Sequence, residues 1–225
     1  MHAHLLDPES GNPPQTLGEE IANSISHGVG LLAVLCGTPF LLIRAAQHGS
    51  AAYITGASIF SGTMILLYLA STLYHAIPIG PVKHRLRILE HMAIFVLIAG
   101  TYTPFTLGVL HGAWGWSLFG LIWGLAILGV TLKAARGFRY PVLFPALYIA
   151  MGWVVLVAIQ PLWMRMPHAG FFWILGGGLA YTAGVVFYAI DYRMRYSHFI
   201  WHLFVLAGTT LHYFAVFFYA EGALP

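Results

Sequence analysis

Two histidines spaced four residues apart, His198 and His202, stand in the segment YSHFIWHLF of an otherwise apolar stretch. Residues four apart share one face of a helix and lie one turn from each other. Two imidazoles in that arrangement can chelate one metal ion, as the paired histidines of zinc-protease helices do. The spacing also fits two histidines at a membrane interface, or one that is hydrogen-bonded within a bundle. On this pair alone, all of these interpretations stay open.

A second pair with the same spacing, Ser71 and His75, lies in LYLASTLYHAIPIG, and Glu90 follows in VKHRLRILEHMAIF. These residues could supply a third imidazole, a hydroxyl and a carboxylate. Each also has an ordinary structural role. A serine can bond back to its own helix, a histidine is favoured near a helix C-terminus, and Glu90 can form a salt bridge with Arg87, three residues earlier.

A polar stripe opens the first apolar segment, where EEIANSISHGVG carries Glu20, Asn23 and His27. Their spacing of i, i+3 and i+7 places all three on one helix face. Glu20 also suits a helix N-terminus, where negative charge complements the helix dipole. The stripe is therefore a candidate support for a site, or simply a helix start.

The composition excludes an ordinary soluble domain. Of the 225 residues, 59% are hydrophobic and 8% are charged, and the mean hydropathy is +0.79. A soluble domain carries about 25% charged residues. The single cysteine, Cys36, allows neither an internal disulfide nor a thiolate metal site. Any transition metal must therefore be held by nitrogen and oxygen.

Charge-free gaps predict the membrane spans. A spanning helix needs about 20 residues. The gaps between charged residues run from 23 to 42 residues, and the longest divides in two at HGAWGW. The predicted spans lie near residues 22–43, 51–77, 86–109, 114–132, 141–160, 170–190 and 198–219. We therefore expect an all-α integral membrane protein built as a seven-transmembrane-helix bundle.

The rest of the chain completes this domain organisation. Residues 1–19 are expected to form a flexible polar tail, because they lack the basic flank and apolar core of a cleaved signal peptide. Residues 20–225 are expected to form a single transmembrane domain.

Lysine and arginine predict the orientation. Eight of the ten basic residues fall in three loops on one side of the predicted bundle, and two fall on the other. The positive-inside rule places those three loops, and the N-terminus, in the cytoplasm, with the C-terminus outside. The sequence pI of 9.1 then reflects loops that face anionic lipid, and it implies no nucleic-acid partner. The expected location is the cell membrane, inner or plasma, with membrane lipids as partners.

Helix direction brings the polar residues together. Successive spans alternate in direction, so the second span ends at the face where the first, third and seventh begin. The polar residues expected in this one layer, the cytoplasmic leaflet, are Glu20, Asn23, His27, Ser71, His75, Glu90, His198 and His202. Three histidines from two helices suit Zn²⁺ and leave a fourth position for water, whereas calcium and magnesium want more oxygen ligands. His212 falls mid-helix in the outer half, where we expect it to bond a neighbouring helix.

Four stretches in the expected order, EEIANSISHGVG, STLYHAI, LEHMAIFVLIAGTYTPF and SHFIWHLFVLAGTTLHYFA, resemble the haemolysin III family. This family is the bacterial branch of the adiponectin and progestin receptor superfamily, and the resemblance runs from Glu19 to about Tyr219. It implies a seven-helix fold with zinc near the cytoplasmic face. The metal ligands implied are His75, His198 and His202, and the motif serine is Ser71.

The third helix departs from the family pattern. The family usually places an aspartate near the metal where this chain has Glu90. The added methylene could let the carboxylate bind zinc directly or push it aside to pair with Arg87.

Three functions are compatible with these features. The first is a zinc-dependent intramembrane hydrolase that acts on lipid amides or esters, or regulates membrane lipid homeostasis, with Ser71 and Glu90 as the catalytic pair and Glu20, Asn23 and His27 behind the ligands. The second is a non-enzymatic membrane sensor with a structural zinc site. The third, suggested by the family name, is a haemolytic pore. Polarity confined to one leaflet argues against the pore. The sequence does not indicate the oligomeric state.

Overall fold

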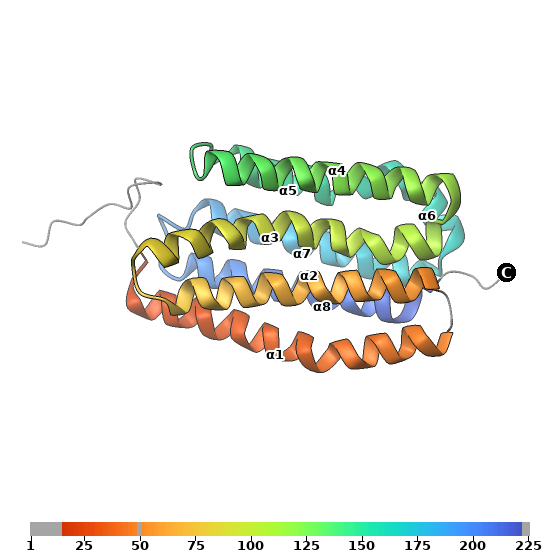
Figure 1. Cartoon of the computed structure of the whole chain (residues 1–225), viewed down its shortest axis with the longest axis horizontal. Coiled ribbons are helices and arrows are strands. Elements are labelled where there is room, and N and C mark those ends of the chain that lie inside the picture. The colour runs from red at the N-terminus through yellow and green to blue at the C-terminus, as the bar shows by residue number, and fades with distance from the viewer. Residues whose placement is uncertain (1–14, 49–50, 222–225) are drawn as a thin grey trace, which may run out of the picture.

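The computed structural model describes residues 15–48 and 51–221. Across these residues, seven helical segments are long and apolar enough to cross a membrane. Their elements are α-helical apart from a five-residue π-helix, η1 (Thr106–Leu110), and a five-residue 3₁₀ helix, η2 (Val154–Ala158). In chain order the elements are α1 (Leu17–His48), α2 (Ala51–Ala76), α3 (Pro81–Phe105), η1 (Thr106–Leu110), α4 (Gly112–Arg136), α5 (Leu143–Gly152), η2 (Val154–Ala158), α6 (Ile159–Arg165), α7 (His168–Ala189) and α8 (Ser197–Tyr219). The predicted seven-helix fold class is confirmed (Figure 1).

Several helices are longer than the charge-free gaps predict. The first span was expected over 22–43, but α1 has 32 residues and is therefore about 48 Å long, against a hydrocarbon core of about 30 Å. Charge-free gaps mark the part of a helix that sits in hydrocarbon, and the helix continues into the interface. Residues 17–19, assigned above to the polar tail, belong to α1, and residues 1–14 lie outside the described residues.

The fifth span is interrupted, because the 3₁₀ turn η2 separates α5 from α6. The Tyr102 hydroxyl shares its one proton between the carbonyls of Met151 at 2.9 Å and Gly152 at 2.8 Å, and it accepts a hydrogen bond from the Val155 amide at 2.9 Å. Backbone groups freed by a helix break must be satisfied inside the bundle, because lipid offers no partner. A tyrosine from α3 thus stabilises the irregular segment.

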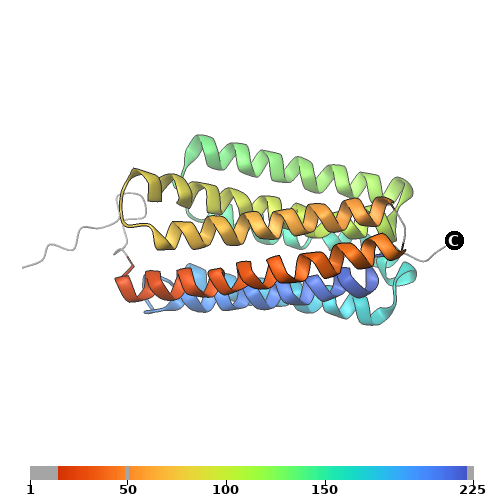
Figure 2. The same cartoon turned by 60° about the horizontal axis from the view of Figure 1, so that its bottom comes forward.

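The helices pack as an antiparallel bundle. α1 lies between α2 and α8, α2 packs on α3, α3 packs on α4, and α7 packs on α8 (Figures 1 and 2). α1, α3 and α8 all begin at the end of the bundle where α2 ends, as Figure 1 shows. This arrangement confirms the shared layer that helix direction predicts. It brings the polar N-terminal turns of α1, α3 and α8 close to His75 of α2.

Two glycines of GGGLAYTAG in α7, Gly177 and Gly184, pack against another helix of the same chain. A Cβ at Gly177 would lie 2.3 Å from the ring of His212, and a Cβ at Gly184 would lie 2.8 Å from Trp201. Both partners belong to α8. Glycine allows the two helices to approach closely, as small residues do in membrane bundles.

Candidate metal centre

Three histidines converge at the end of the bundle where α1, α3 and α8 begin. The ligand nitrogens of His75 from α2 and of His198 and His202 from α8 all lie within 4.8 Å of one another. His75 and His202 are 3% and 1% exposed, and the side chain of His198 is 12% exposed. The i, i+4 spacing on α8 sets two of these imidazoles one turn apart on the same face. We call these three residues the histidine triad.

One nitrogen of each triad ring has no hydrogen-bond partner in the described part of the chain. Among the described residues, no protein group hydrogen-bonds to the buried Nε2 atoms of His75, His198 and His202. An unsatisfied buried polar group costs about 1–3 kcal/mol. Three histidines gathered in this way offer lone pairs that a bound cation would satisfy. An all-nitrogen set of three ligands fits zinc, so the residues present match the metal that the sequence predicts.

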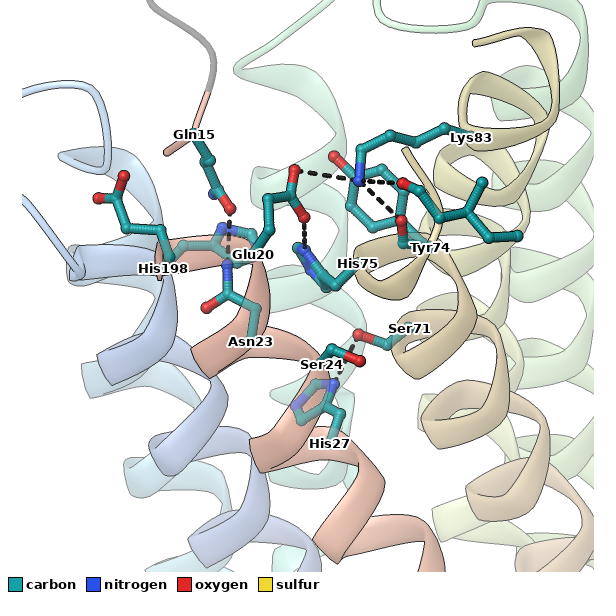
Figure 3. Close-up of polar contacts among 12 residues, drawn as sticks. Gln15, Glu20, Asn23, Ser24, His27, Ser71, Tyr74, His75, Lys83 and His198 are labelled. Carbon is teal, nitrogen blue, oxygen red and sulfur yellow. Dashed lines mark hydrogen bonds and ion pairs between the residues drawn. The ribbon is translucent and has the colours of Figure 1, made fainter. Parts of the chain in front are cut away.

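The other ring nitrogens of two triad members are fixed by acceptors. His75 Nδ1 lies 2.8 Å from Glu20 Oε2, and the second carboxylate oxygen of Glu20 lies 3.0 Å from Lys83 Nζ (Figure 3). His202 Nδ1 lies 3.2 Å from the Asn23 carbonyl and 3.1 Å from Ser26 Oγ. A carboxylate or carbonyl can only accept, so Nδ1 carries the proton and Nε2 keeps its lone pair. Outer carboxylates and carbonyls orient metal-binding histidines in the same way.

His27 on α1 lies directly against the triad, although the sequence predicts only a supporting role for it. The ring of His27 stacks on that of His202, with centroids 3.5 Å apart and planes 7° apart. Its Nδ1 lies 2.7 Å from Ser71 Oγ, and its buried Nε2 has no hydrogen-bond partner among the described residues (Figure 3). One ligand atom each from His27, Glu90 and His202 also lie within 4.8 Å of one another.

The unusual carboxylate of α3 lies beside the triad. Glu90 is 5% exposed, and its Oε1 is 3.8 Å from His75 Nε2. Ser71, whose Oγ lies 2.7 Å from His27 Nδ1, is also close to this carboxylate. The longer side chain therefore keeps its charge at the histidines, next to both Ser71 and His75.

All eight residues singled out in the sequence meet in this cluster, and three further residues that the pattern did not single out complete it. Ser26 holds His202, Lys83 holds Glu20, and Asp191 Oδ2 lies 3.6 Å from His198 Nδ1. Ser26 follows Asn23 by three residues, so the helical period could have revealed it. Lys83 and Asp191 lie outside the polar helix faces, so no spacing rule points to them.

Two hollows adjoin the cluster. A small pocket is lined by His27, Glu90, His198 and Trp201, among others. A larger cavity of about 150 Å³ extends along the bundle, and its walls are almost entirely apolar. The residues that line both are Leu67, Ile94, Trp201 and Val205. The apolar cavity therefore adjoins the small pocket beside the histidines and runs toward the other end of the protein.

Comparison with known proteins agrees with this geometry. The model of the family described as haemolysin-III related matches residues 15–213. The chain is 44% identical over 204 residues to the haemolysin-3 homologue of Bacillus subtilis (strain 168), which covers 91% of this chain and 95% of that protein. The chain belongs to the haemolysin III family. The haemolysin-3 of Bacillus cereus is 42% identical over 205 residues, or 91% of this chain and 93% of that protein.

More distant relatives place the haemolysin III family within a wider group. The human monocyte to macrophage differentiation factor is 27% identical over 221 residues, which cover 94% of this chain and 89% of that protein. The family membership and the placement in the adiponectin and progestin receptor superfamily are confirmed. No solved structure matches the chain.

The bond from Glu20 to His75 gives a testable prediction about metal affinity. We expect Glu20→Gln to weaken zinc binding by about 10–100-fold, as loss of an outer carboxylate on a metal-binding histidine commonly does. The matched control is Glu19→Gln. Glu19 lies one residue away and bonds the Tyr196 amide at 2.9 Å and Thr16, not a histidine. Zinc competition titrations on both variants measure the difference, and equal affinities in the two variants would show that Glu20 does not support the site.

Proposed function

We propose that this haemolysin III protein is a zinc-dependent intramembrane hydrolase that acts on lipid amides or esters. The observation that carries the proposal is the histidine triad, which stands beside Glu90 and Ser71 at the mouth of an apolar cavity. A structural metal site needs neither a free carboxylate at the ligands nor a cavity for an apolar chain. Both features are what a hydrolase for lipids requires.

In the proposed reaction, zinc and the neighbouring side chains have separate roles. When bound by His75, His198 and His202, zinc would polarise a carbonyl and acidify a water molecule. Glu90 is the group that accepts a proton from water and delivers it to the leaving atom. Its burial beside His75 keeps it within reach of the reacting atoms. Ser71 lies beside Glu90, and its hydroxyl can donate to a developing oxyanion.

The apolar cavity accounts for the substrate class. Its walls include Leu97, Ile98, Phe105 and Leu162, and it shares Trp201 and Val205 with the small pocket at the histidines. A lipid carbonyl at the triad would leave its acyl chain in this cavity, out of contact with water. Burial of each methylene contributes roughly 0.8 kcal/mol. The acyl chain of the substrate therefore determines binding, and the carbonyl group at the triad is the group hydrolysed.

The proposal places the reaction in the cytoplasmic leaflet of the cell membrane. Eight of the ten Lys and Arg residues belong to the loops or helix ends on the triad side. The positive-inside rule assigns that side to the cytoplasm. Lys83, which bonds Glu20 beside the triad, is one of these residues.

The test is a hydrolysis assay on purified, zinc-loaded protein in lipid nanodiscs. We expect fatty acid to be released from at least one ceramide, other lipid amide or lipid ester, and the release to stop when a chelator removes zinc. If no fatty acid is released from a broad panel of lipids, the protein is not a lipid hydrolase. If chelation still lowers the thermal stability of the protein in that case, the result supports a non-enzymatic sensor with a structural zinc site. Ion flux through protein in liposomes would instead support the haemolytic pore that the relatives' names suggest.

A further inference from the structure

His212 is a buried polar residue that the metal centre does not use. It lies on α8, is 8% exposed and lines the apolar cavity. It stands ten residues beyond His202 on the same helix, which is roughly 15 Å along the axis. Most of the cavity wall is apolar, so the placement of an imidazole in it requires an explanation.

The tautomer of His212 follows from its one hydrogen bond. Its Nε2 lies 3.0 Å from the Ile174 carbonyl on α7. The carbonyl can only accept, so Nε2 carries the proton, and a neutral imidazole then has a bare lone pair on Nδ1. This bond confirms that His212 bonds a neighbouring helix, as expected, but it uses only one of the two ring nitrogens.

The second nitrogen is an acceptor without a donor. Among the described residues, no protein group hydrogen-bonds to the buried Nδ1 of His212. The Cδ2 and Nε2 edge of the ring packs against Gly177 on α7. Nδ1 therefore lies on the opposite edge of a ring that lines the cavity.

Three hydroxyls of the cavity wall already use their protons elsewhere. A hydroxyl has one proton, and the protons of three cavity-lining hydroxyls are already given to backbone carbonyls. Thr101 donates to Leu97 at 2.8 Å, Thr182 donates to Gly178 at 2.8 Å, and Tyr102 donates to Met151 at 2.9 Å. These three hydroxyls therefore offer Nδ1 of His212 no free donor.

We infer that the cavity selects lipid chains that carry a hydrogen-bond donor, a hydroxyl group, partway along an otherwise apolar chain, and that Nδ1 of His212 accepts this hydrogen bond. The apolar walls hold the methylenes, and the imidazole fixes the position of the hydroxyl. The inference rests on the proposed function only in placing the lipid head at the histidine triad. It concerns binding and selectivity, not turnover.

The test is competition binding to the purified, zinc-loaded protein. A set of long-chain fatty acids of equal length, each with one hydroxyl at a different carbon, displaces a fluorescent fatty acid. We expect one position, or two adjacent positions, in the middle of the chain to bind about tenfold more tightly than the unsubstituted acid, which is the worth of one good buried hydrogen bond. Equal affinity of the wild-type protein for all hydroxyl positions would overturn the inference, since no ligand hydroxyl would then bind Nδ1 of His212.

Two variants assign the preference. His212→Leu should bind all members of the set alike while it keeps wild-type zinc content, and Thr101→Val, which removes a cavity hydroxyl and preserves shape, should keep the positional preference. A preference that survives in His212→Leu, or is lost only in Thr101→Val, overturns the role of His212. If His212→Leu does not fold, the wild-type profile decides alone. If the protein hydrolyses lipids but binds all hydroxyl positions equally, only this inference is wrong. If it prefers one hydroxyl position but hydrolyses no lipid, only the proposed function is wrong.

Discussion

Replacement of Glu90 by glutamine is expected to slow lipid hydrolysis by about 10²–10⁴-fold, the usual contribution of a general acid–base group. The substitution keeps the size of the side chain and removes its ability to take up a proton. Glu90 is buried beside His75 and Ser71 and is not a member of the triad. Zinc content should therefore stay at the wild-type level. Initial rates of fatty-acid release, with metal analysis of the same samples, measure both effects.

The control for Glu90 is the shorter carboxylate. Glu90→Asp restores the residue that the family resemblance implies at this position, and it keeps the charge. We expect it to retain activity within about tenfold of wild type, since a displacement of one methylene alters orientation and not chemistry. If glutamine and glutamate support equal rates, Glu90 moves no proton. If Glu90→Gln instead loses zinc, the carboxylate is a ligand.

Loss of any triad histidine is expected to have the largest effect on stability. Each histidine contributes one of three nitrogens from two helices, α2 and α8, that are distant in sequence. Zinc at a thousand times its dissociation constant stabilises the folded state by about 4 kcal/mol, which corresponds to roughly 10 °C in Tm for a chain of this size. Chelation of wild-type protein should lower Tm by that amount and should change the Tm of His75→Ala very little.

A histidine at the opposite end of the bundle provides the comparison. His168 begins α7 and stacks on Trp163 with ring centroids 3.8 Å apart. His168→Ala removes an imidazole from the protein but not from the triad, so its Tm should still fall on chelation. An equal Tm for wild type with and without chelator would show that metal, if bound, does not stabilise the fold.

The sequence was sufficient to predict the helices and the layer that holds the site. Charge-free gaps reveal spans because charges are costly in hydrocarbon. Alternating direction then brings His75 to the level of His198 and His202, without knowledge of side-chain contacts. The helix ends were less predictable, since α1 continues past the charge-free gap at both ends. The break in the fifth span was also missed, because it depends on Tyr102 of α3, a contact between distant residues.

Within the site, the residues were predictable and their pairings were not. The polar stripe of the first helix pointed to Glu20 and Asn23, but it could not show that Glu20 holds His75 or that Asn23 uses its backbone carbonyl on His202. The stacking of His27 on His202 depends on how α1 and α8 pack, which helical spacing does not specify. His212 illustrates the same limit. Its bond to α7 was foreseen, and the unpaired nitrogen opposite was not.

The most direct test of the metal centre is the zinc-to-protein ratio of purified wild type beside His75→Ala and His198→Ala. The triad predicts about one zinc ion per wild-type chain and almost none in either variant, because the site has three protein ligands and loss of one leaves only two. Full zinc occupancy in both variants would contradict the triad, and with it the hydrolase built on it.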